Sequence, residues 1–332
     1  PLGGNPPTGP FPAAASTPRD APTATSRNAR SPAPRRERRI VPGYVQAREY
    51  PRRAMGEDAL LFEDVPVEGS SPEGGAISVW TLNRPGKLNA LNSQSHKEIK
   101  EQCARVESDD SVRCVVIRGA TPPEPEEGRR PKPPAFAAGA DISEFSGKDS
   151  DDVRPFFENN AWEAVWNLSK PTIAMVDGFA LGGGTELALS CDIRIASDRS
   201  TFGQPEINLG LIPGGGGTQR LCRLVGYGRA MEIVLAGGMI PAEDALQMGI
   251  VNRVVPAEEL ESATMELAGE IARKSPYTTK VAKRAVRGAL DLPFSEGVLM
   301  ERSEFVALFD TEDKEIGVQA FLERSEAKWV GR

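Results

Sequence analysis

Two glutamates, each behind a glycine-containing turn, are the side chains of this sequence best placed to do acid–base chemistry. Glu186 ends the run Gly182-Gly183-Gly184-Thr185-Glu186, and Glu206 ends the run Phe202-Gly203-Gln204-Pro205-Glu206. Glycine has no Cβ, so a bound molecule can approach the backbone of such turns closely. A carboxylate beside that backbone can accept a proton from the molecule or donate one to it. If both glutamates face one cavity, the chain is an enzyme with two carboxylates and a backbone site for an anion.

The residues around the triple glycine predict the order strand, turn, helix. Residues 172–176 (Thr-Ile-Ala-Met-Val) are typical of a buried strand, and Glu186-Leu187-Ala188-Leu189 is typical of a helix. A helix that begins at this turn directs its unpaired N–H groups and the positive end of its dipole back at the glycines. Such donors can stabilise an oxyanion. A tight turn that only packs against a sheet has the same composition, so the triple glycine alone does not decide.

A second segment of small residues favours the anion site. Residues 135–142 (Ala-Phe-Ala-Ala-Gly-Ala-Asp-Ile) contain a glycine and precede another predicted helix start. Two segments of this kind could each donate one N–H group to the same oxygen. Each glutamate by itself still has a simpler explanation. Glu186 could be an acid favoured in the first turn of a helix, and Glu206 could be a loop residue after Pro205.

Composition excludes several other kinds of site. The chain has 332 residues with 40 basic and 47 acidic side chains, and no apolar run approaches the roughly 18 residues of a membrane span. Its cysteines (Cys103, Cys114, Cys191 and Cys222) include no Cys-x-x-Cys pair, which favours free thiols over disulfides or a zinc site. The single histidine, His96, lies in a polar helical stretch, and we expect it at the surface. One histidine excludes a His-rich metal site and argues against a Ser-His-Asp triad.

The first 55 residues differ from the rest of the chain. They contain 11 of the 28 prolines, ten arginines and three acids, a net charge of +7, whereas the remainder has 30 basic and 44 acidic residues, a net charge of −14. The segment lacks hydrophobic periodicity and is predicted to be disordered. Three interpretations stay open: a solvated extension, which we favour, an organelle-targeting segment, or an arm that binds nucleic acid or a partner through residues 35–39. Because the remainder is acidic, a nucleic-acid partner is not expected.

Predicted strands and helices alternate from about residue 56, and the C-terminal part is helical. The predicted strands cover residues 77–82, 113–118, 172–176, 192–196 and 250–254. The predicted helices begin at Asn92 or Ser93 and near residues 156, 186, 217, 229, 242, 257, 277, 294 and 311. The charged, Pro-rich residues 121–134 predict a solvent-facing loop. We therefore expect an extension over 1–55, an α/β core over 56–265 and a helical region over 266–332.

Several long motifs in this order resemble the enoyl-CoA hydratase/isomerase (crotonase) family. The resemblance covers nearly all of residues 75–328. Its most specific motifs are Ala137-Ala138-Gly139-Ala140-Asp141-Ile142, Ala180-Leu181-Gly182-Gly183-Gly184-Thr185-Glu186-Leu187-Ala188, Phe202-Gly203-Gln204-Pro205-Glu206 and Pro213-Gly214-Gly215-Gly216-Gly217-Thr218-Gln219-Arg220-Leu221. The resemblance implies an α/β fold built as a spiral of ββα units, with a helical C-terminal trimerisation region. It also implies an acyl-CoA thioester as the substrate and a homotrimer or homohexamer as the assembly.

The resemblance further implies roles for individual residues. The backbone N–H groups of Ala140 and Gly183 would form an oxyanion hole. Glu186 and Glu206 both match the hydratase carboxylates of the family, so that Glu186 would take a proton from the attacking water and Glu206 would protonate C2. The residues implied in substrate binding are Ala138, Ala140, Asp141, Ile142, Ser143, Gly182 and Gly183. No metal is implied, and no cofactor beyond the coenzyme A of the substrate.

Two features depart from the pattern of the family. Ser143 stands where a lysine or arginine is common, which puts one contact with coenzyme A in doubt. The loop over 121–134 is longer than expected and could line the entrance for coenzyme A. Arg84, Lys87 and Arg324 are candidate phosphate contacts, although we expect each of them to be a solvated surface side chain.

The leading hypothesis, because of the paired glutamates, is a 2-enoyl-CoA hydratase. Such an enzyme is a hydro-lyase of fatty acid or related acyl-CoA degradation. Isomerisation of a 3-enoyl-CoA needs one proton-shuttling glutamate and stays an alternative. A family member that binds RNA or a partner through residues 1–55 is a second alternative. We expect a cytoplasmic protein without membrane contact, with the mitochondrial matrix as the alternative compartment.

Overall fold

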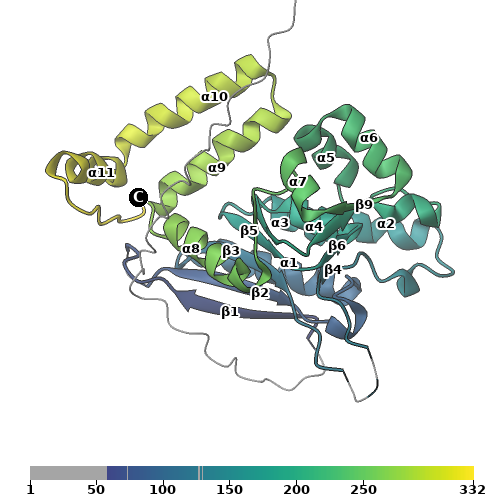
Figure 1. Cartoon of the computed structure of the whole chain (residues 1–332). Helices are drawn as coiled ribbons and strands as arrows, with labels where there is room; N and C mark the ends of the chain where they lie inside the picture. Colours follow the sequence, from purple (N-terminus) through teal and green to yellow (C-terminus); the bar gives the residue numbers. More distant parts are fainter. Residues whose placement is uncertain (1–57, 73, 126–127, 129) are drawn as a thin grey trace, which may run out of the picture. The chain divides into compact units, whose positions relative to one another are not determined.

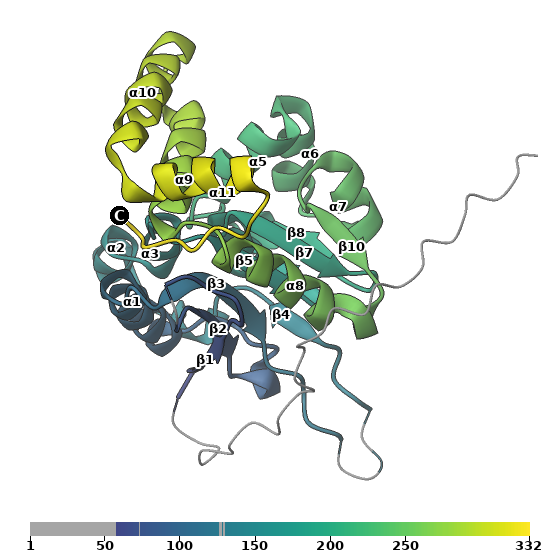
Figure 2. The same ribbon diagram turned by 90° about the vertical axis from the view of Figure 1, so that its left-hand side faces the viewer.

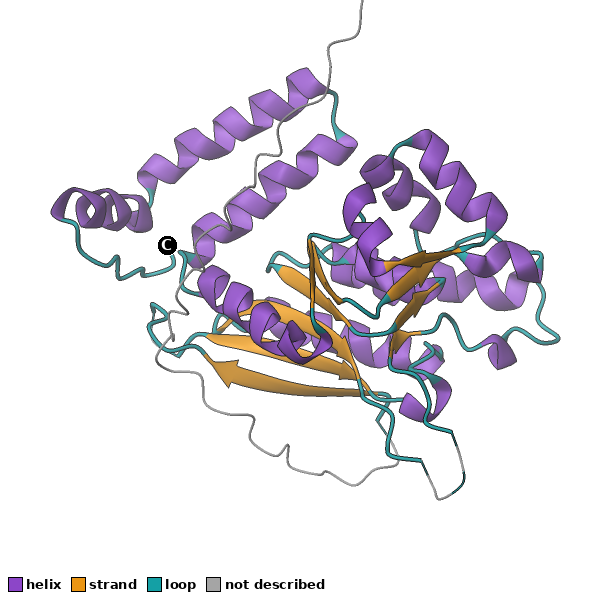
Figure 3. Ribbon diagram, in the orientation of Figure 1, coloured by secondary structure: helices purple, strands orange, loops and turns teal. Residues whose placement is uncertain are grey.

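The computed structural model describes residues 58–72, 74–125, 128 and 130–332, and all of them fall in the unit Glu49–Arg332 of the chain. The predicted extension over residues 1–55 lies outside the described residues, so the three interpretations of it stay predictions. The described part contains two β-sheets covered by helices, as Figures 1 and 3 show.

The larger sheet of the described residues has the strand order β1-β2-β3-β5-β7-β10. Its strands are β1 (Leu60–Pro66), β2 (Ala76–Leu82), β3 (Val112–Gly119), β5 (Thr172–Val176), β7 (Ile193–Ser197) and β10 (Arg253–Val255). The edge strand β1 pairs antiparallel with β2, and all other neighbours in this sheet are parallel. Each parallel pair needs a crossover connection, which is why other elements separate these strands along the sequence.

The smaller sheet supplies part of those crossovers. It has the order β4-β6-β8-β9, with β4 at Ala135–Ala137, β6 at Phe179–Leu181, β8 at Thr201–Gly203 and β9 at Met239–Pro241. Strands β3, β5 and β7 of the larger sheet are each followed by a strand of the smaller sheet and then by helical residues. The chain therefore repeats a strand–strand–helix unit, and the predicted spiral of ββα units is confirmed.

The strands of the smaller sheet were not predicted from the sequence. Each of them has three residues, too few to show a hydrophobic alternation. Strand β9 also lies where no strand was predicted, between the helices expected to begin near residues 229 and 242. Strand β1 was missed for another reason: most of its side chains are exposed, so it lacks a buried face that alternates with polar positions.

Apart from α2 and α3, the helices begin within about three residues of the predicted starts. They are α1 (Ser93–Ser108), α2 (Ser150–Glu158), α3 (Ala161–Trp166), α4 (Gly183–Ser190), α5 (Gly217–Val225), α6 (Tyr227–Ala236), α7 (Ala242–Met248), α8 (Leu260–Ala272), α9 (Pro276–Asp291), α10 (Phe294–Ala307) and α11 (Glu312–Glu323). Asn92 caps α1 through a reciprocal pair of bonds with Ser95. The one helix expected around residues 156–166 is two helices, because Asn160 accepts a bond from the N–H of Glu163 and begins α3 there.

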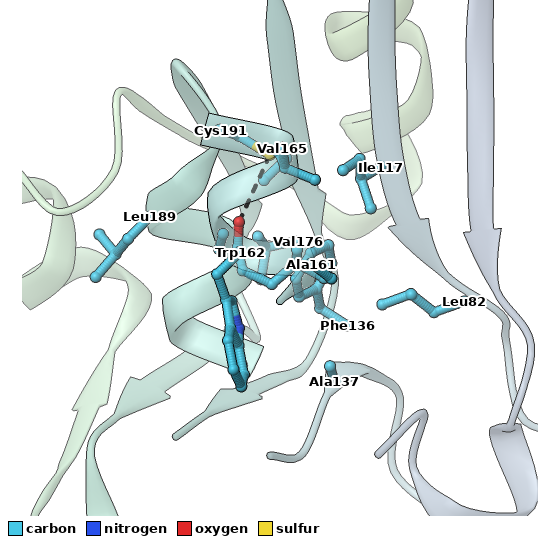
Figure 4. Packing of buried hydrophobic residues seen from close by; sticks show 14 of the residues in the cluster. Leu82, Ile117, Phe136, Ala137, Ala161, Trp162, Val165, Val176, Leu189 and Cys191 are labelled. Carbon is cyan, nitrogen blue, oxygen red and sulfur yellow. Dashed lines mark hydrogen bonds between the residues drawn. The ribbon is translucent and has the colours of Figure 1, made fainter. Parts of the chain in front are cut away.

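Two hydrophobic clusters fill the two faces of the larger sheet. On β3, Cys114 and Val116 face one cluster, and Val115 and Ile117 face the other, as the period of two in a strand requires. Helix α8 covers the first face. The second face packs against α1, α3 and α4, and Figure 4 shows residues of this cluster, among them Ile117 of β3, Val165 of α3 and Leu189 of α4. This packing fixes α4, the helix that carries Glu186, to the sheet.

Helices α9, α10 and α11 follow beyond the sheet (Figures 1 and 2). The predicted boundary between residues 265 and 266 falls inside α8, which belongs to the packing of the sheet. Helices α9 and α10 contact each other. The final residues run back toward α8, where Nε1 of Trp329 donates to the carbonyl of Arg273 at 2.9 Å. None of the helices in the described residues is long and apolar enough to cross a membrane.

The four cysteines are free thiols, as predicted. Cys103, Cys114 and Cys191 are buried, and burial raises the pKa of each of these thiols to about 12. They are therefore protonated and unreactive at neutral pH.

His96 corrects an expectation from the sequence, because it is buried and not at the surface. Only 3% of the residue is exposed, and its ring packs edge-on against Phe156 and Trp162 with centroids 4.4 and 4.5 Å away. Its Nδ1 accepts a bond from the N–H of Ala161 at 3.3 Å. Burial, and to a lesser degree the charge of Lys100, lowers the pKa of His96 to about 4. Ser93, Gln94 and Lys97, which lie beside His96 in the sequence, are exposed on α1, which is why they misled the prediction.

The lowered pKa of His96 predicts a specific acid sensitivity. The unfolded state binds a proton at His96 below pH about 6.5, whereas the folded state binds one only near pH 4, so stability is lost as the pH falls between these values. The loss between pH 7 and pH 4.5 is about 2 kcal/mol for this group. In His96→Asn the side-chain oxygen can still accept from Ala161. We expect the free energy of unfolding of this variant to fall by about 2 kcal/mol less than that of the wild type over this range. Urea unfolding of both proteins at pH 7 and pH 4.5, at one protein concentration, measures it, and equal losses would contradict it.

Candidate active site

Glu186 is held by backbone N–H groups. It lies in the first turn of α4, with 2% of the residue exposed, and its Oε1 accepts from the N–H groups of Gly215 and Gly217 at 2.7 Å each. A Cβ on Gly217 would lie 3.0 Å from this oxygen, and a Cβ on Gly215 would overlap the ring of Trp162. The four-glycine run 214–217 therefore brings two donors to the carboxylate. This contact between the four-glycine run and Glu186 was not predicted from the sequence.

Glu206 reaches the same site from a short 3-10 helix, Pro205–Leu209. A Cβ on Gly182 would lie 2.7 Å from Oε1 of Glu206, and Gly182 has a φ of +49°, so glycine is required there. Oriented with its nitrogen toward Glu206, the buried amide of Gln204 donates to both carboxylate oxygens at 3.0 Å each. The other end of this amide lies beside Gly217, where a Cβ would come within 2.5 Å of it. Gln204 thus connects the surroundings of the two glutamates.

The two carboxylates differ in how they are stabilised as anions. Burial raises the pKa of Glu186, and the N–H groups of Gly217 and Gly215 and the charge of Arg220 oppose that shift. Burial raises the pKa of Glu206 to about 7, a backbone bond opposes the shift, and the charge of Glu186 adds to it. Carboxylates that interact this way titrate as a pair. Both carboxylates accept hydrogen bonds, but only Glu186 also has a cation, Arg220, that lowers its pKa. The arrangement therefore favours an ionised Glu186 and places the proton of the pair on Glu206.

The backbone N–H groups of Ala140 and Gly183 lie side by side. Leu91 donates to the carbonyl of Gly139 and accepts from the N–H of Asp141, so the N–H of Ala140 between them points to the other side. Gly183 begins α4, where N–H groups have no partner within the helix. A Cβ on Gly183 would lie 3.5 Å from the nitrogen of Ala140. Within the described part of the chain neither N–H has an acceptor, so both are free to bind one oxygen.

Trp162 supports the Gly183 turn and was assigned from the sequence only to a helix. Its Nε1 donates to the carbonyl of Gly183 at 2.9 Å, and a Cβ on Gly183 would lie 3.1 Å from its ring. Figure 4 shows this ring with other residues of the buried cluster, to which Ala137 also belongs. A Cβ on Gly184 would overlap the carbonyl oxygen of Ala137, so α4 packs directly on β4. These contacts fix the start of α4 relative to the segment that carries Ala140.

The remaining residues that were predicted to bind substrate form the segment from Ala138 to Ser143. Asp141 is engaged in contacts within the protein, since it accepts from Oγ of Ser143 at 2.6 Å and pairs with Arg84 at 2.7 Å. These two partners lower the pKa of Asp141 to about 2. The side chains of Ile142 and Ser143 are exposed. The segment therefore presents mainly its backbone and the apolar side chain of Ile142 to a bound molecule.

The candidate phosphate contacts divide into two groups. Arg84 is not the solvated surface side chain that we expected, because it pairs with Asp141 and donates to the carbonyl of Ala90 at 2.6 Å. Lys87 and Arg324 are exposed, as expected. The described residues of the predicted loop over 121–134 contain no helix or strand and are mostly exposed.

Known proteins share this sequence and this fold. Residues 73–332 match the family described as enoyl-CoA hydratase/isomerase. A short-chain-enoyl-CoA hydratase of Clostridium acetobutylicum is 41% identical over 252 residues, which cover 75% of this chain and 92% of that protein. A probable mitochondrial enoyl-CoA hydratase of Dictyostelium discoideum is 41% identical over 258 residues, which cover 77% of this chain and 88% of that protein.

Solved structures agree with the sequence comparisons. The crystal structure of enoyl-CoA hydratase from Bacillus anthracis superposes with a TM-score of 0.74 at 32% identity, covering 83% of this chain and all of that one. The match extends over the strand–strand–helix repeats and the C-terminal helices, and the motifs around the two glutamates lie inside the matched residues 73–332. This chain therefore belongs to the enoyl-CoA hydratase/isomerase family.

Proposed function

We propose that this protein is an enoyl-CoA hydratase, which adds water across the 2,3 double bond of a 2-enoyl-CoA to give a 3-hydroxyacyl-CoA. The observation that carries the proposal is the pair of glutamates in one site, with Glu186 held as an acceptor by two N–H groups and the pKa of Glu206 raised to about 7. Relatives about 40% identical are named enoyl-CoA hydratases, in agreement with this chemistry.

The thioester oxygen would bind between the N–H groups of Ala140 and Gly183. Attack of water on C3 moves negative charge through C2 to this oxygen, and the two donors would stabilise the resulting enolate. Each fixed donor of this kind contributes on the order of 3 kcal/mol to lowering the barrier. The donors belong to backbone that is fixed by Leu91, Trp162 and the packing of α4, so they need no rearrangement during the reaction.

The two glutamates would divide the proton transfers between them. The oxygen of Glu186 that is not bound by Gly215 and Gly217 accepts a proton from the water as its oxygen forms the bond to C3. Glu206 donates its proton to C2, and the double bond is consumed. Glu186 then holds one proton more and Glu206 one proton fewer, and exchange with solvent restores both.

The residues from Ala138 to Ser143, with Gly182, would bind the acyl-CoA mainly through backbone atoms. Asp141 then contributes by shaping the segment through Arg84 and Ser143. The reaction moves protons and no electrons, so we propose that it needs no cofactor besides the coenzyme A of the substrate.

A panel of 2-enoyl-CoA substrates of different chain length and branching tests the proposed function. The purified protein should remove the conjugated absorbance of at least one of them and form the 3-hydroxyacyl-CoA. A 3-enoyl-CoA assayed beside them distinguishes isomerisation, which would generate that absorbance. If no member of the panel is hydrated, the proposed function is wrong, whether or not isomerisation occurs.

We propose that the protein forms homotrimers, which could pair as hexamers, through its C-terminal helices. Helices α10 and α11 expose large apolar side chains, among them Phe294 (89% exposed) and Phe321 (83% exposed). An exposed apolar surface of this kind is typical of a subunit interface. We expect Phe321→Glu to shift the protein toward monomers in analytical ultracentrifugation, with Leu61→Glu on the edge strand β1 as the control. A wild-type protein that sediments as a monomer would overturn the proposal.

The compartment follows from the relatives only. We propose a cytoplasmic protein, as the bacterial relatives suggest, and the relative of Dictyostelium named as mitochondrial makes the mitochondrial matrix the alternative.

A further inference from the structure

A guanidinium group lies next to the backbone that holds Glu186. Arg220 belongs to α5, and its Nη1 donates to the carbonyl of Gly215 at 2.6 Å, while the N–H of the same glycine donates to Glu186. A Cβ on Gly216 would overlap this guanidinium, and Gly216 has a φ of +97°. The side chain of Arg220 therefore folds back over the first turn of its own helix, toward the four-glycine run.

The start of a helix is an unfavourable place for a cation. The positive end of the helix dipole lies there and favours anions. Burial of Arg220 also disfavours its charged form and lowers its pKa. The charge of Glu186 opposes this effect more than any other charge around Arg220. The ionised Glu186 thus stabilises the Arg220 cation, and the cation stabilises the ionised Glu186 in return.

Aromatic and ionic contacts hold Arg220 in this position. Its guanidinium lies over the ring of Trp166, with Cζ 4.7 Å from the centroid. Arg287 of α9 lies over the same ring at 4.0 Å and is fixed by an ion pair with Asp192 at 2.9 Å. The planar guanidinium can stack on the ring and bond to Gly215 at once, which an ammonium group cannot do.

The charged groups around the two side chains, the two side chains included, come from five elements. Glu163 of α3 attracts Arg220 as Glu186 of α4 does, and Arg287 of α9 repels it. The charged groups that act on Glu186 are Arg220 of α5, which stabilises its anion, and Glu206, whose own carboxyl is the other member of the pair. No cation of the described residues acts on the pKa of Glu206. Arg220 therefore acts on one glutamate of the pair and not on the other.

We propose that Arg220 is a positioning residue of the active site, which fixes the Gly215 backbone against Glu186 and, by its charge, keeps Glu186 ionised while Glu206 carries the proton. The proposal rests on the proposed hydratase function for its kinetic consequences, but its electrostatic part concerns the free protein.

Two variants of Arg220 separate charge from shape. Arg220→Gln removes the charge and keeps a donor that can reach toward Gly215, and Arg220→Lys keeps the charge and loses the planar stack. The kcat/KM for crotonyl-CoA is measured against pH for both. We expect the acid limb, where Glu186 becomes protonated, to move up by about one pH unit in Arg220→Gln and to stay in place in Arg220→Lys. In both variants we expect kcat to fall about tenfold, because Gly215 is held less well.

Arg223→Gln is the matched control. Arg223 lies one turn further along α5 and is exposed, and it contacts Gln219 and the carbonyl of Leu290 and no residue of the site. Its pH profile should equal that of the wild type.

Three results would overturn the proposal. The first is an acid limb that stays in place in a folded Arg220→Gln protein, which would leave Arg220 a structural role only. The second is an equal movement of the limb in both variants. The third result applies if Arg220→Gln does not fold. It is an acid limb that moves in Arg220→Lys, although this variant keeps the charge. A ¹³C NMR titration of the Glu186 carboxyl measures the same shift without substrate, so that a failure of the hydratase proposal and a failure of this one can be told apart.

Discussion

Replacing Glu186 by glutamine is expected to lower kcat by about 10³-fold, within the range of roughly 10² to 10⁴ that is typical for a general base. The side-chain oxygen of glutamine can still accept from the N–H groups of Gly215 and Gly217, so the geometry of the turn is kept. What is lost is the ability to take a proton from water. Steady-state hydration of a short 2-enoyl-CoA, with circular dichroism to check the fold, measures the effect.

Glu232→Gln is the control for this substitution. Glu232 is exposed on α6, so the same chemical change there should leave the rate unaltered. Substrate binding to Glu186→Gln should also be nearly unchanged, because the oxyanion donors are backbone groups of Ala140 and Gly183. A rate within tenfold of the wild type would mean that another group activates the water, and the assignment of Glu186 would be wrong.

Replacing Glu206 by glutamine is expected to lower kcat by a similar factor and to remove a limb of the pH profile. In the wild type, Glu206 must be protonated to donate to C2, and the pKa of Glu206 is raised to about 7. The kcat/KM should therefore fall about tenfold per pH unit above pH about 7. Glutamine has no proton to give at any pH, so the slow rate that remains should be flat across this range.

The pH profile separates this role from a structural one. Loss of a carboxylate that only shapes the site would lower the rate equally at every pH and leave the alkaline limb where it was. The double substitution of Glu186 and Glu206 should cost little more than either single one, because two groups that act in one step are not additive.

The sequence predicted the fold well where patterns are long. Helix α1 has the cap Asn92, helix α5 from Gly217 has one apolar face, and the strand over 172–176 is a continuous run of buried residues. The strands β4, β6, β8 and β9 were not found, because three residues hold no period. These short strands form the second sheet, which distinguishes the fold from a simple alternation of strands and helices. The spiral of ββα units was therefore predicted from the resemblance to the family and not from hydrophobic periodicity.

The site was predictable in its residues and less so in its contacts. Glu186, Glu206, Ala140 and Gly183 could be named because they lie in motifs. The bonds from Gly215 and Gly217 to Glu186 join residues about 30 positions apart, and local sequence carries no signal for such a pairing. His96 was misplaced for a related reason: its burial comes from α2 and α3, which lie more than 50 residues away.

The donors that hold Glu186 and those proposed to hold the thioester oxygen all belong to the main chain. Amino-acid substitution replaces side chains and leaves N–H groups in place, proline excepted, so these donors are kept in most substitutions outside the glycines, where a Cβ would clash. Exposed side chains around it, such as Ile142, can change without moving a donor. The fold therefore separates two evolutionary tasks: the chemistry is kept by the path of the backbone, and the choice of acyl group is free to vary with the side chains. An engineer who wishes to change the substrate of this protein should alter the second set and leave the glycines alone.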